Sequence, residues 1–209
     1  MKITKIDQSL EIADNVYSLS ASMKGMKKNA SNTLNQTLVD LANILGDKVE
    51  WALCGGLSVG VYARARGTED VDIIVRDASV IDSIEQICNT IFKRTRMHAM
   101  VHKSTGVEVE ILDPAFIKVD PSIISTAIKT SQIVLLGNAS VRVVTKNGLI
   151  ALKLTRASSQ DVADIETILQ LHPDIDLSEY KLQQKEIELF HNIKNSVENT
   201  NTPTDDLPI

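Results

Sequence analysis

The sequence predicts an α/β (α+β) fold, in which helices pack on a mixed β-sheet and a helical part follows it. Three observations lead to this prediction. Short apolar runs rich in Val and Ile alternate with longer stretches at helical spacing. From Lys146 onward helical spacing dominates. The 209 residues are 43% hydrophobic, enough for one sizeable core. We therefore expect a core at 1–145 that includes N-terminal helices, a helical part at 146–195 and a flexible tail at 196–209.

The chain is expected to open with two helices. Ile6 to Met23 carries apolar residues at near-helical spacing, and a polar break follows at residues 25–32. Leu34 to Leu45 forms a second amphipathic pattern, and Gly46 is suited to end that helix. We expect the apolar side of this second helix to cover one face of the sheet.

A glycine pair then joins a strand to a helix. Val49 to Cys54 alternates as a strand does, and Leu57 to Ala65 reads as a short helix. Between them, Gly55 and Gly56 allow a tight turn and a close approach of the backbone to a ligand. Such a corner directs free N–H groups and the positive helix end toward an anion, and Ser58 adds a hydroxyl donor. The alternative is a plain corner without a ligand.

Two aspartates open the next strand. Asp70 and Asp72 are two residues apart, so their side chains share a face of the strand that continues through Ile73 to Val75. Adjacent carboxylates repel each other unless a cation lies between them. Magnesium suits such a pair, because it prefers carboxylate oxygens together with substrate phosphates. The alternative is an exposed strand end with two solvated acids.

The stretch from the glycine pair to the aspartates resembles the signature of the DNA polymerase β-like nucleotidyltransferases. That signature begins with an apolar residue, then Gly, and then either Gly or Ser. About a dozen residues follow, and the signature ends with Asp-apolar-Asp. Arg66 and Thr68 precede Asp70 and resemble the Arg-x-Ser/Thr-x-Asp form of small bacterial members. Those members include abortive-infection toxins of toxin–antitoxin pairs and aminoglycoside nucleotidyltransferases.

A third carboxylate is implied downstream by the same resemblance. His98 to His102 and Val107 to Leu112 are predicted strands joined by a turn at Gly106. On the second strand, Glu110 followed by two apolar residues resembles the acid-apolar-apolar ending of the family. Glu108 points to the same side and stays an alternative. Family members more often carry Asp at this position.

The segments around these strands are expected to be ordinary fold elements. Asp77 or Ser79 can cap a helix that runs to Ile91. The basic stretch Lys93 to His98 is interpreted as a solvated turn, with contact to acceptor phosphates as the alternative. Further on, Pro121 opens a helix. Two apolar runs, residues 133–136 and 141–144, follow it as a hairpin.

The C-terminal helices carry a second point of resemblance. Small toxin-like nucleotidyltransferases have a Lys, then an Arg, then Lys-Asp-x-x-Asp-Ile. This chain has Lys153, Asp161, Asp164 and Ile165 in that pattern, with Gln160 where the family often has Lys. The resemblance implies that Lys153 meets a triphosphate, and the alternative is a charge on a helix surface. A last helix is expected from residue 177 to 194, before the polar tail.

Composition and hydrophobic pattern limit the kinds of partner and the cellular location that we expect. The net charge of -5 argues against a general nucleic-acid-coating surface. Cys54 and Cys88 lie within apolar patterns without metal or redox spacing, so we expect buried thiols. The four histidines are expected to be structural or exposed rather than metal ligands. No apolar run is long enough to span a bilayer, and we expect a cytoplasmic location without membrane partners.

The expected function is a nucleotidyltransferase that depends on Mg²⁺ or Mn²⁺ and moves a nucleoside monophosphate from a triphosphate to a hydroxyl acceptor. Catalysis and metal binding are assigned to Asp70, Asp72 and Glu110. Nucleotide binding is assigned to Gly55, Gly56, Ser58, Arg66 and Lys153. The acceptor stays open between an RNA end, a protein and a small molecule, and an antitoxin is a conceivable partner. The rival hypothesis is a catalytically silent binding protein on the same fold.

Overall fold

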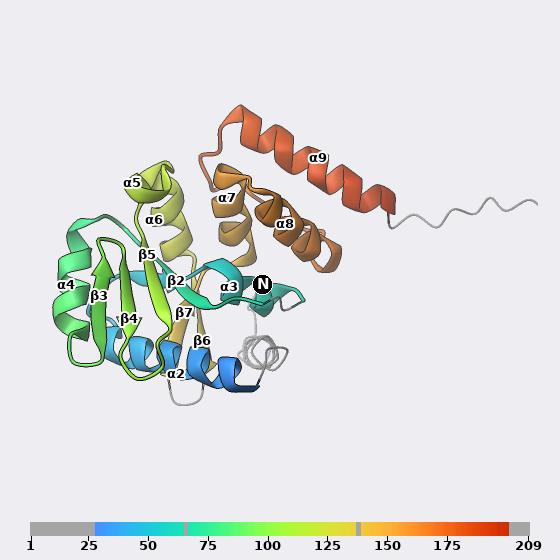
Figure 1. Cartoon of the computed structure of the whole chain (residues 1–209). Helices are drawn as coiled ribbons and strands as arrows, with labels where there is room; N and C mark the ends of the chain where they lie inside the picture. The colour runs from blue at the N-terminus through green and yellow to red at the C-terminus, as the bar shows by residue number, and fades with distance from the viewer. Residues whose placement is uncertain (1–27, 65–66, 137–138, 201–209) are drawn as a thin grey trace, which may run out of the picture.

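The computed structural model describes residues 28–64, 67–136 and 139–200. Within these ranges, seven strands form one mixed sheet in the order β3-β4-β5-β2-β1-β7-β6, with helices on both faces (Figure 1). The predicted mixed α/β fold is confirmed. The strands are β1 (Trp51–Leu53), β2 (Asp70–Val75), β3 (Phe92–Arg96), β4 (Ala99–His102), β5 (Glu108–Leu112), β6 (Gln132–Leu136) and β7 (Ala139–Val143). The helices are α2 (Lys28–Leu45), α3 (Gly55–Tyr62), α4 (Ser79–Cys88), α5 (Pro114–Ile117), α6 (Pro121–Lys129), α7 (Lys146–Arg156), α8 (Ser159–Leu171) and α9 (Gln184–Thr200).

The centre of the sheet combines parallel and antiparallel pairing. β2 runs parallel to β5 and β1 runs parallel to β7, whereas β1 and β2 are antiparallel. The parallel pairing of β2 with β5 needs a crossover connection. α4, β3 and β4 provide it. The pairing places the start of β2 beside the start of β5, which is where both strands carry acidic residues.

The side chains of β2 alternate between two hydrophobic cores. Val71, Ile73 and Val75 are fully buried in the core that also contains α2 and α4. Ile74 points to the other face and is buried in a second core with residues of α6, α7, α8 and α9. Asp70 and Asp72 share the face of Ile74, because residues two apart on a strand point the same way. The two aspartates thus lie on the helical C-terminal side of the sheet, before the strand reaches that core.

The basic stretch Lys93 to His98 is not a solvated turn, and this interpretation was wrong. Phe92 to Arg96 form β3, which pairs antiparallel with β4 at the edge of the sheet. Phe92 is 2% exposed and anchors the strand in the core. The sequence did not predict this strand, because the remaining side chains of β3 are polar and give no strand-like hydrophobic pattern. Only its pairing with β4 makes it a strand.

The last helix differs from its predicted bounds at both ends. α9 begins at Gln184 rather than at residue 177, and the Glu186 carboxylate accepts a hydrogen bond from the Gln183 N–H (2.7 Å). The helix continues through Thr200, because Val197 still packs in the second core. Residues 196–200 are therefore helical rather than part of a tail. The rest of the expected tail and the expected helix from Ile6 to Met23 lie outside the described residues.

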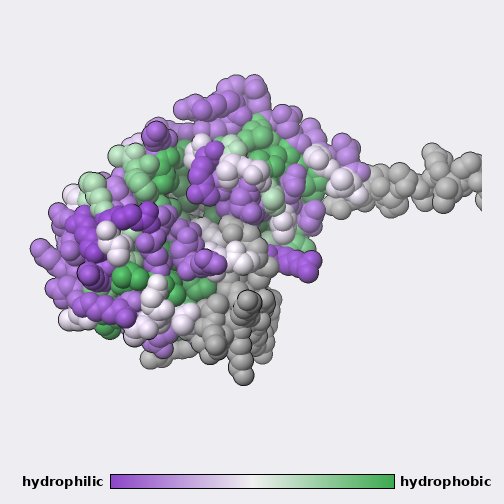
Figure 2. Space-filling model, in the orientation of Figure 1, coloured by the Kyte–Doolittle hydropathy of each residue, from purple (hydrophilic) through white to green (hydrophobic). Residues whose placement is uncertain are grey.

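Other predicted elements occur with shifted bounds: α3 begins at Gly55 rather than Leu57, and α4 ends at Cys88 rather than Ile91, with Ala78 rather than Asp77 or Ser79 at its N-cap position. The helix expected over Leu34 to Leu45 lies within α2, and the expected hairpin is the antiparallel pair β6 and β7. In Figure 2 the face turned to the viewer is mostly hydrophilic, with apolar patches set between polar groups. None of the helices in the described ranges has the length and hydrophobicity that crossing a bilayer requires.

The cover that α2 places on the sheet predicts a large effect of truncation. Leu41 is 0% exposed, and Leu41→Ala should lower the free energy of unfolding by about 2–5 kcal/mol through lost burial and the remaining cavity. Leu171 of α8 is 62% exposed, so the control Leu171→Ala should change it by less than about 0.5 kcal/mol. Urea denaturation of the three proteins measures both effects. Equal effects would show that α2 does not pack on the sheet as described.

Candidate functional site

Four carboxylate side chains lie together on one face of the sheet. The parallel register of β2 and β5 places Asp70 beside Glu108 and Asp72 beside Glu110. Neighbouring strands lie about 4.8 Å apart, and partners in a parallel pair point to the same face. The sequence predicted that each pair shares a face. The pairing of the two strands adds that the pairs adjoin, and we call these four residues the acidic array.

Asp72 is the most strongly perturbed member of the acidic array. Burial, followed by the charges of Asp70 and Glu110, raises the pKa of its carboxyl group to about 6, although Arg156 and the hydrogen bond from Gly56 act in the opposite direction. Glu110 contributes to this shift whereas Glu108 is not among its main causes. This agrees with the register, which places Glu110 directly beside Asp72.

The glycine corner packs directly against Asp72. Gly55 has a positive φ of 65°, and a Cβ atom at this position would lie 1.7 Å from Oδ2 of Asp72. The backbone N–H of Gly56 donates a hydrogen bond to the same carboxylate. The backbone N–H of Cys54 donates to the Asp72 carbonyl oxygen (2.9 Å). The N-terminal end of α3 thus faces the Asp72 carboxylate. Binding of a phosphate at this helix end stays a prediction.

The remaining members of the acidic array have polar partners of their own. Thr68 donates a hydrogen bond to Asp70 (2.8 Å). Arg96 of β3 pairs with Glu108 and lies 3.5 Å from Oε1 of Glu110. With these contacts in place, no three His, Cys, Asp or Glu side chains in the described ranges are gathered as a metal-binding group.

A narrow pocket separates Asp72 from α7. Its volume is about 60 Å³, well below the roughly 300–1,000 Å³ of sites that enclose small molecules. Its wall is apolar apart from one carboxylate, two cations and a hydroxyl. The lining residues are Cys54, Gly55, Asp72, Ile74, Leu112, Ile117, Leu149, Leu152, Lys153, Thr155 and Arg156. The pocket therefore has a negative end at the acidic array and a positive end at α7.

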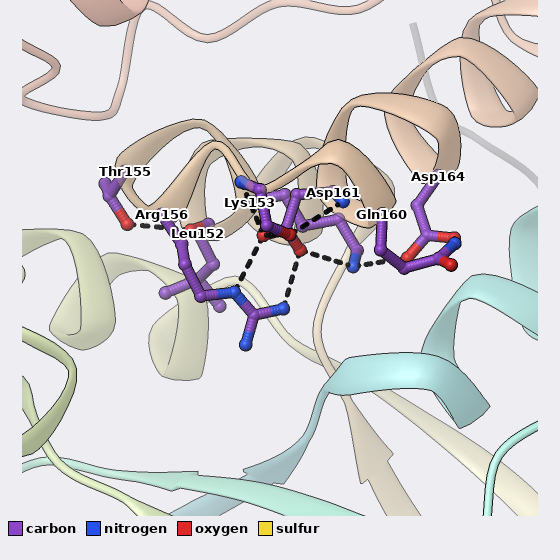
Figure 3. A network of polar contacts seen from close by, with 8 residues as sticks. Leu152, Lys153, Thr155, Arg156, Gln160, Asp161 and Asp164 are labelled. Atoms are coloured by element: carbon purple, nitrogen blue, oxygen red, sulfur yellow. Dashed lines mark hydrogen bonds and ion pairs between the residues drawn. The ribbon is translucent and has the colours of Figure 1, made fainter.

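Lys153 takes part in a buried ion-pair network (Figure 3). Its side chain is 4% exposed, and Nζ lies 3.2 Å from Oδ1 of Asp161 and 2.6 Å from Oδ2 of Asp164. Gln160 donates a further hydrogen bond to Asp164 (3.0 Å). The pattern of residues that suggested a triphosphate contact is thus brought together by α7 and α8. Its Lys, however, is already engaged by two carboxylates.

Arg156 also lies at this pocket, although no role was predicted for it from the sequence. It lines the pocket together with Asp72, and its side chain is 62% exposed. Its guanidinium group makes two hydrogen bonds to Asp161, from Nε (2.7 Å) and from Nη2 (2.6 Å). The spacing of Lys153 and Arg156, one helical turn apart, was a signal that both reach the same side of α7. It did not show which cation stays open.

Asp161 holds the network together from the first turn of α8. Burial alone would raise the pKa of Asp161, but hydrogen bonds from Arg156 and Ser158 and the charge of Lys153 hold it well below its usual range. Ser158 caps α8 and donates to the Asp161 carboxylate through Oγ (2.6 Å). The carboxylate therefore stays ionised and fixed at neutral pH.

Of the two other predicted nucleotide-binding residues, Ser58 is described by the structure and does not line the pocket. Ser58 is fully buried within α3, away from the pocket lining, and its hydroxyl has no hydrogen-bond partner among the described residues. Arg66 lies outside the described residues.

Cys54 and Cys88 are buried free thiols, as predicted, and burial raises the pKa of Cys88 to about 11.

The comparisons with known proteins support the fold. No protein-family model and no curated protein matches the sequence. Among solved structures, the chain is similar to a crystal structure described as an antigenic nucleotidyltransferase-like protein from Paracoccidioides brasiliensis. The TM-score is 0.61 at 17% identity, over 81% of this chain and 91% of that one. The likeness shows a nucleotidyltransferase-like fold.

The contact between Gly55 and Asp72 predicts that no side chain is tolerated at the corner. Gly55→Ala would place Cβ within the Asp72 carboxylate. The positive φ alone costs an alanine about 1–2 kcal/mol, so the free energy of unfolding should fall by more than this. Gly67 has open space around it, and the control Gly67→Ala should have little effect. Chemical denaturation of both variants tests this, and a tolerated Gly55→Ala would contradict the corner geometry.

The raised pKa of Asp72 predicts a dependence of stability on pH. The folded value of about 6 exceeds the unfolded value of about 3.9. The folded protein therefore holds this proton more tightly, and the contribution of Asp72 to stability falls as pH rises from about 4 to about 6. Asp72→Asn stays neutral, so its melting temperature relative to wild type should rise through this window.

Melting curves at pH 4, 5, 6 and 8 in metal-free buffer measure this difference. The control is Asp47→Asn, because the side chain of Asp47 is fully exposed. Its difference from wild type should stay flat across the same pH range. A flat difference for Asp72→Asn as well would show that its carboxyl group is not perturbed by burial, Asp70 and Glu110.

Proposed function

We propose that this chain is a metal-dependent nucleotidyltransferase, which moves a nucleoside monophosphate from a nucleoside triphosphate to a hydroxyl acceptor. The observation that carries the proposal is the β2–β5 register, which sets Glu110 beside Asp72 at the glycine corner. The nucleotidyltransferase-like fold supports it. The segment from Gly55 to Asp72 also resembles the nucleotidyltransferase signature, and this resemblance in sequence supports the proposal independently of the fold comparison.

The acidic array suits Mg²⁺ or Mn²⁺. Its donors are all carboxylate oxygens, which these cations prefer. The repulsion that helps to raise the pKa of Asp72 is also what a divalent cation between the carboxylates would relieve. Asp70 and Asp72 would hold the metal that meets the triphosphate, and Glu110 would help to hold a second metal. When bound, these metals would offset the charge of the triphosphate and align the attacking and leaving oxygens.

The protein groups around the acidic array divide the remaining work. Gly56 donates its N–H to Asp72 and so fixes the carboxylate at the corner. Glu110 lies at the β5 side of the array, where its carboxylate can accept the proton of an acceptor hydroxyl. Release of Glu110 from Arg96 would make this carboxylate available. Positioning and electrostatics suffice for such a transfer, so no covalent intermediate on the protein is required.

The acceptor that we propose is small or recognised locally. An extended nucleic-acid contact needs a broad Lys and Arg surface. The net charge of this chain is -5. An RNA end, a protein hydroxyl and a small molecule all fit this limit. A toxin role would use one of the first two acceptors and a resistance role the third, so the identity of the labelled acceptor separates these roles.

The assignment of Glu110 predicts a specific pattern of loss. In reactions with labelled nucleoside triphosphates, Mg²⁺ and cell lysate, Glu110→Gln should lower transfer by roughly 10²–10⁴-fold through loss of the proton acceptor. Its binding of a non-hydrolysable triphosphate should stay close to wild type. Glu108→Gln is the matched control, because it removes a carboxylate from the same face of the same strand. Its loss of transfer should be milder.

Three outcomes would count against the proposal. A more severe loss of transfer in Glu108→Gln than in Glu110→Gln would show that Glu108, not Glu110, is the proton acceptor. Metal-independent binding of the triphosphate, measured by calorimetry with a chelator, would remove the role of Asp70 and Asp72. Nucleotide binding by wild type with no labelled product from any of the four triphosphates would favour a catalytically silent binding protein.

A further inference from the structure

The two cations that line the pocket beside Asp72 differ in how far they are already used. Lys153 is 4% exposed and faces Asp161 and Asp164. Arg156 is 62% exposed, and Asp161 engages its Nε and Nη2 groups. A guanidinium group has five N–H donors in a fixed plane. Arg156 therefore has donors left to face an incoming anion, whereas Lys153 lies deep within the protein.

The charges within the network show why Lys153 needs no outside ligand. Lys153 and Arg156 carry two positive charges, and the fully buried carboxylates of Asp161 and Asp164 carry two negative charges. Gln160, which stands where a Lys was expected from the resemblance, adds a neutral donor to Asp164 (3.0 Å). The four charged side chains therefore balance without an outside ligand. Lys153 serves to join α7 to α8 inside the protein.

Asp161 fixes the direction of the Arg156 side chain. Ala157 adopts a left-handed conformation (φ 51°) directly after α7, and α8 begins two residues later. This reversal brings Asp161 back beside Arg156. Oδ2 of Asp161 also receives hydrogen bonds from the Ser158 hydroxyl (2.6 Å) and the Ser158 backbone N–H (3.2 Å), which hold the carboxylate at the start of α8. In Figure 3 the Asp161 carboxylate lies between Arg156 and Lys153.

We infer that Arg156 binds the phosphate groups of the nucleotide, and that Asp161 is the positioning residue that holds its guanidinium group at the pocket. This inference rests on the function proposed above. It replaces the expectation that Lys153 meets the triphosphate. A planar guanidinium group held by one carboxylate can bind phosphate oxygens through its other edge, which is a geometry that an ammonium group does not offer.

The first test compares ligands with and without phosphate. The probes are non-hydrolysable analogues of the four common nucleoside triphosphates and inorganic tripolyphosphate, each with Mg²⁺, and the free nucleosides. Arg156→Ala should weaken binding of the phosphate-bearing probes by roughly 10–100-fold and leave nucleoside binding unchanged. Arg156→Lys should recover part of the loss. The control is Arg76→Ala, which removes a surface arginine paired with Glu50 and should change neither.

The second test separates the position of Arg156 from its charge. Asp161→Asn removes a negative charge, and charge alone would tighten the binding of a polyanion. Loss of position should instead weaken binding of the triphosphate analogues several-fold. In the Arg156→Ala background, Asp161→Asn should have no further effect. Tighter binding, or an effect that persists without Arg156, would overturn the positioning role. If Asp161→Asn does not fold, Ser158→Ala serves as a milder variant, since it removes the hydroxyl contact to the Asp161 carboxylate and the N-cap of α8 but keeps the charge of Asp161.

A Lys153 variant completes the design. Lys153→Met should lower the melting temperature, because the buried Asp161 and Asp164 lose a cation. The preference for triphosphate over nucleoside should remain. Loss of this preference in Lys153→Met, with its retention in Arg156→Ala, would overturn the inference. A wild type that binds no phosphate-bearing probe would overturn both this inference and the proposed function. Arg156-dependent binding without transfer would retain the inference and reject the transferase.

Discussion

The arrangement of this molecule depends on one carboxylate that is held where three elements meet. Asp72 lies on β2, against Gly55 at the start of α3 and beside Glu110 on β5. The space for its Oδ2 exists only because Gly55 has no side chain. Its backbone also receives the hydrogen bond from Cys54 that joins the glycine corner to β2. A single side chain thus couples the end of β1, the start of α3 and the centre of the sheet.

The cost of placing this charge explains much of its surroundings. Burial and two neighbouring carboxylates oppose the ionisation of Asp72, and two arginines from different elements lie beside the acidic array. Arg96 comes from β3 and pairs with the Glu108 row, whereas Arg156 comes from α7 across the pocket. Each arginine is itself held by a carboxylate.

The two faces of β2 show how stability and site chemistry share one strand. Val71, Ile73 and Val75 are buried with α2 and α4, which gives the strand a fixed place in the sheet. On the opposite face, Ile74 is buried under the C-terminal helices while Asp70 and Asp72 precede that cover. Fixing the strand through one face leaves the other free to carry groups that destabilise one another, since their position does not depend on their own contacts.

The sequence by itself determined the features that depend on neighbours along the chain. The glycine corner, the shared face of Asp70 and Asp72, and most helices and strands follow from spacing and turn chemistry. The tertiary structure decided which distant residues meet. The register of β2 with β5 set Glu110 beside Asp72, and the packing of α7 on α8 buried Lys153 while it left Arg156 at the pocket. β3 and the C-terminal turns of α9 also depend on such packing. Local sequence patterns cannot predict these features, because burial and charge pairing depend on contacts between segments that are far apart in the sequence.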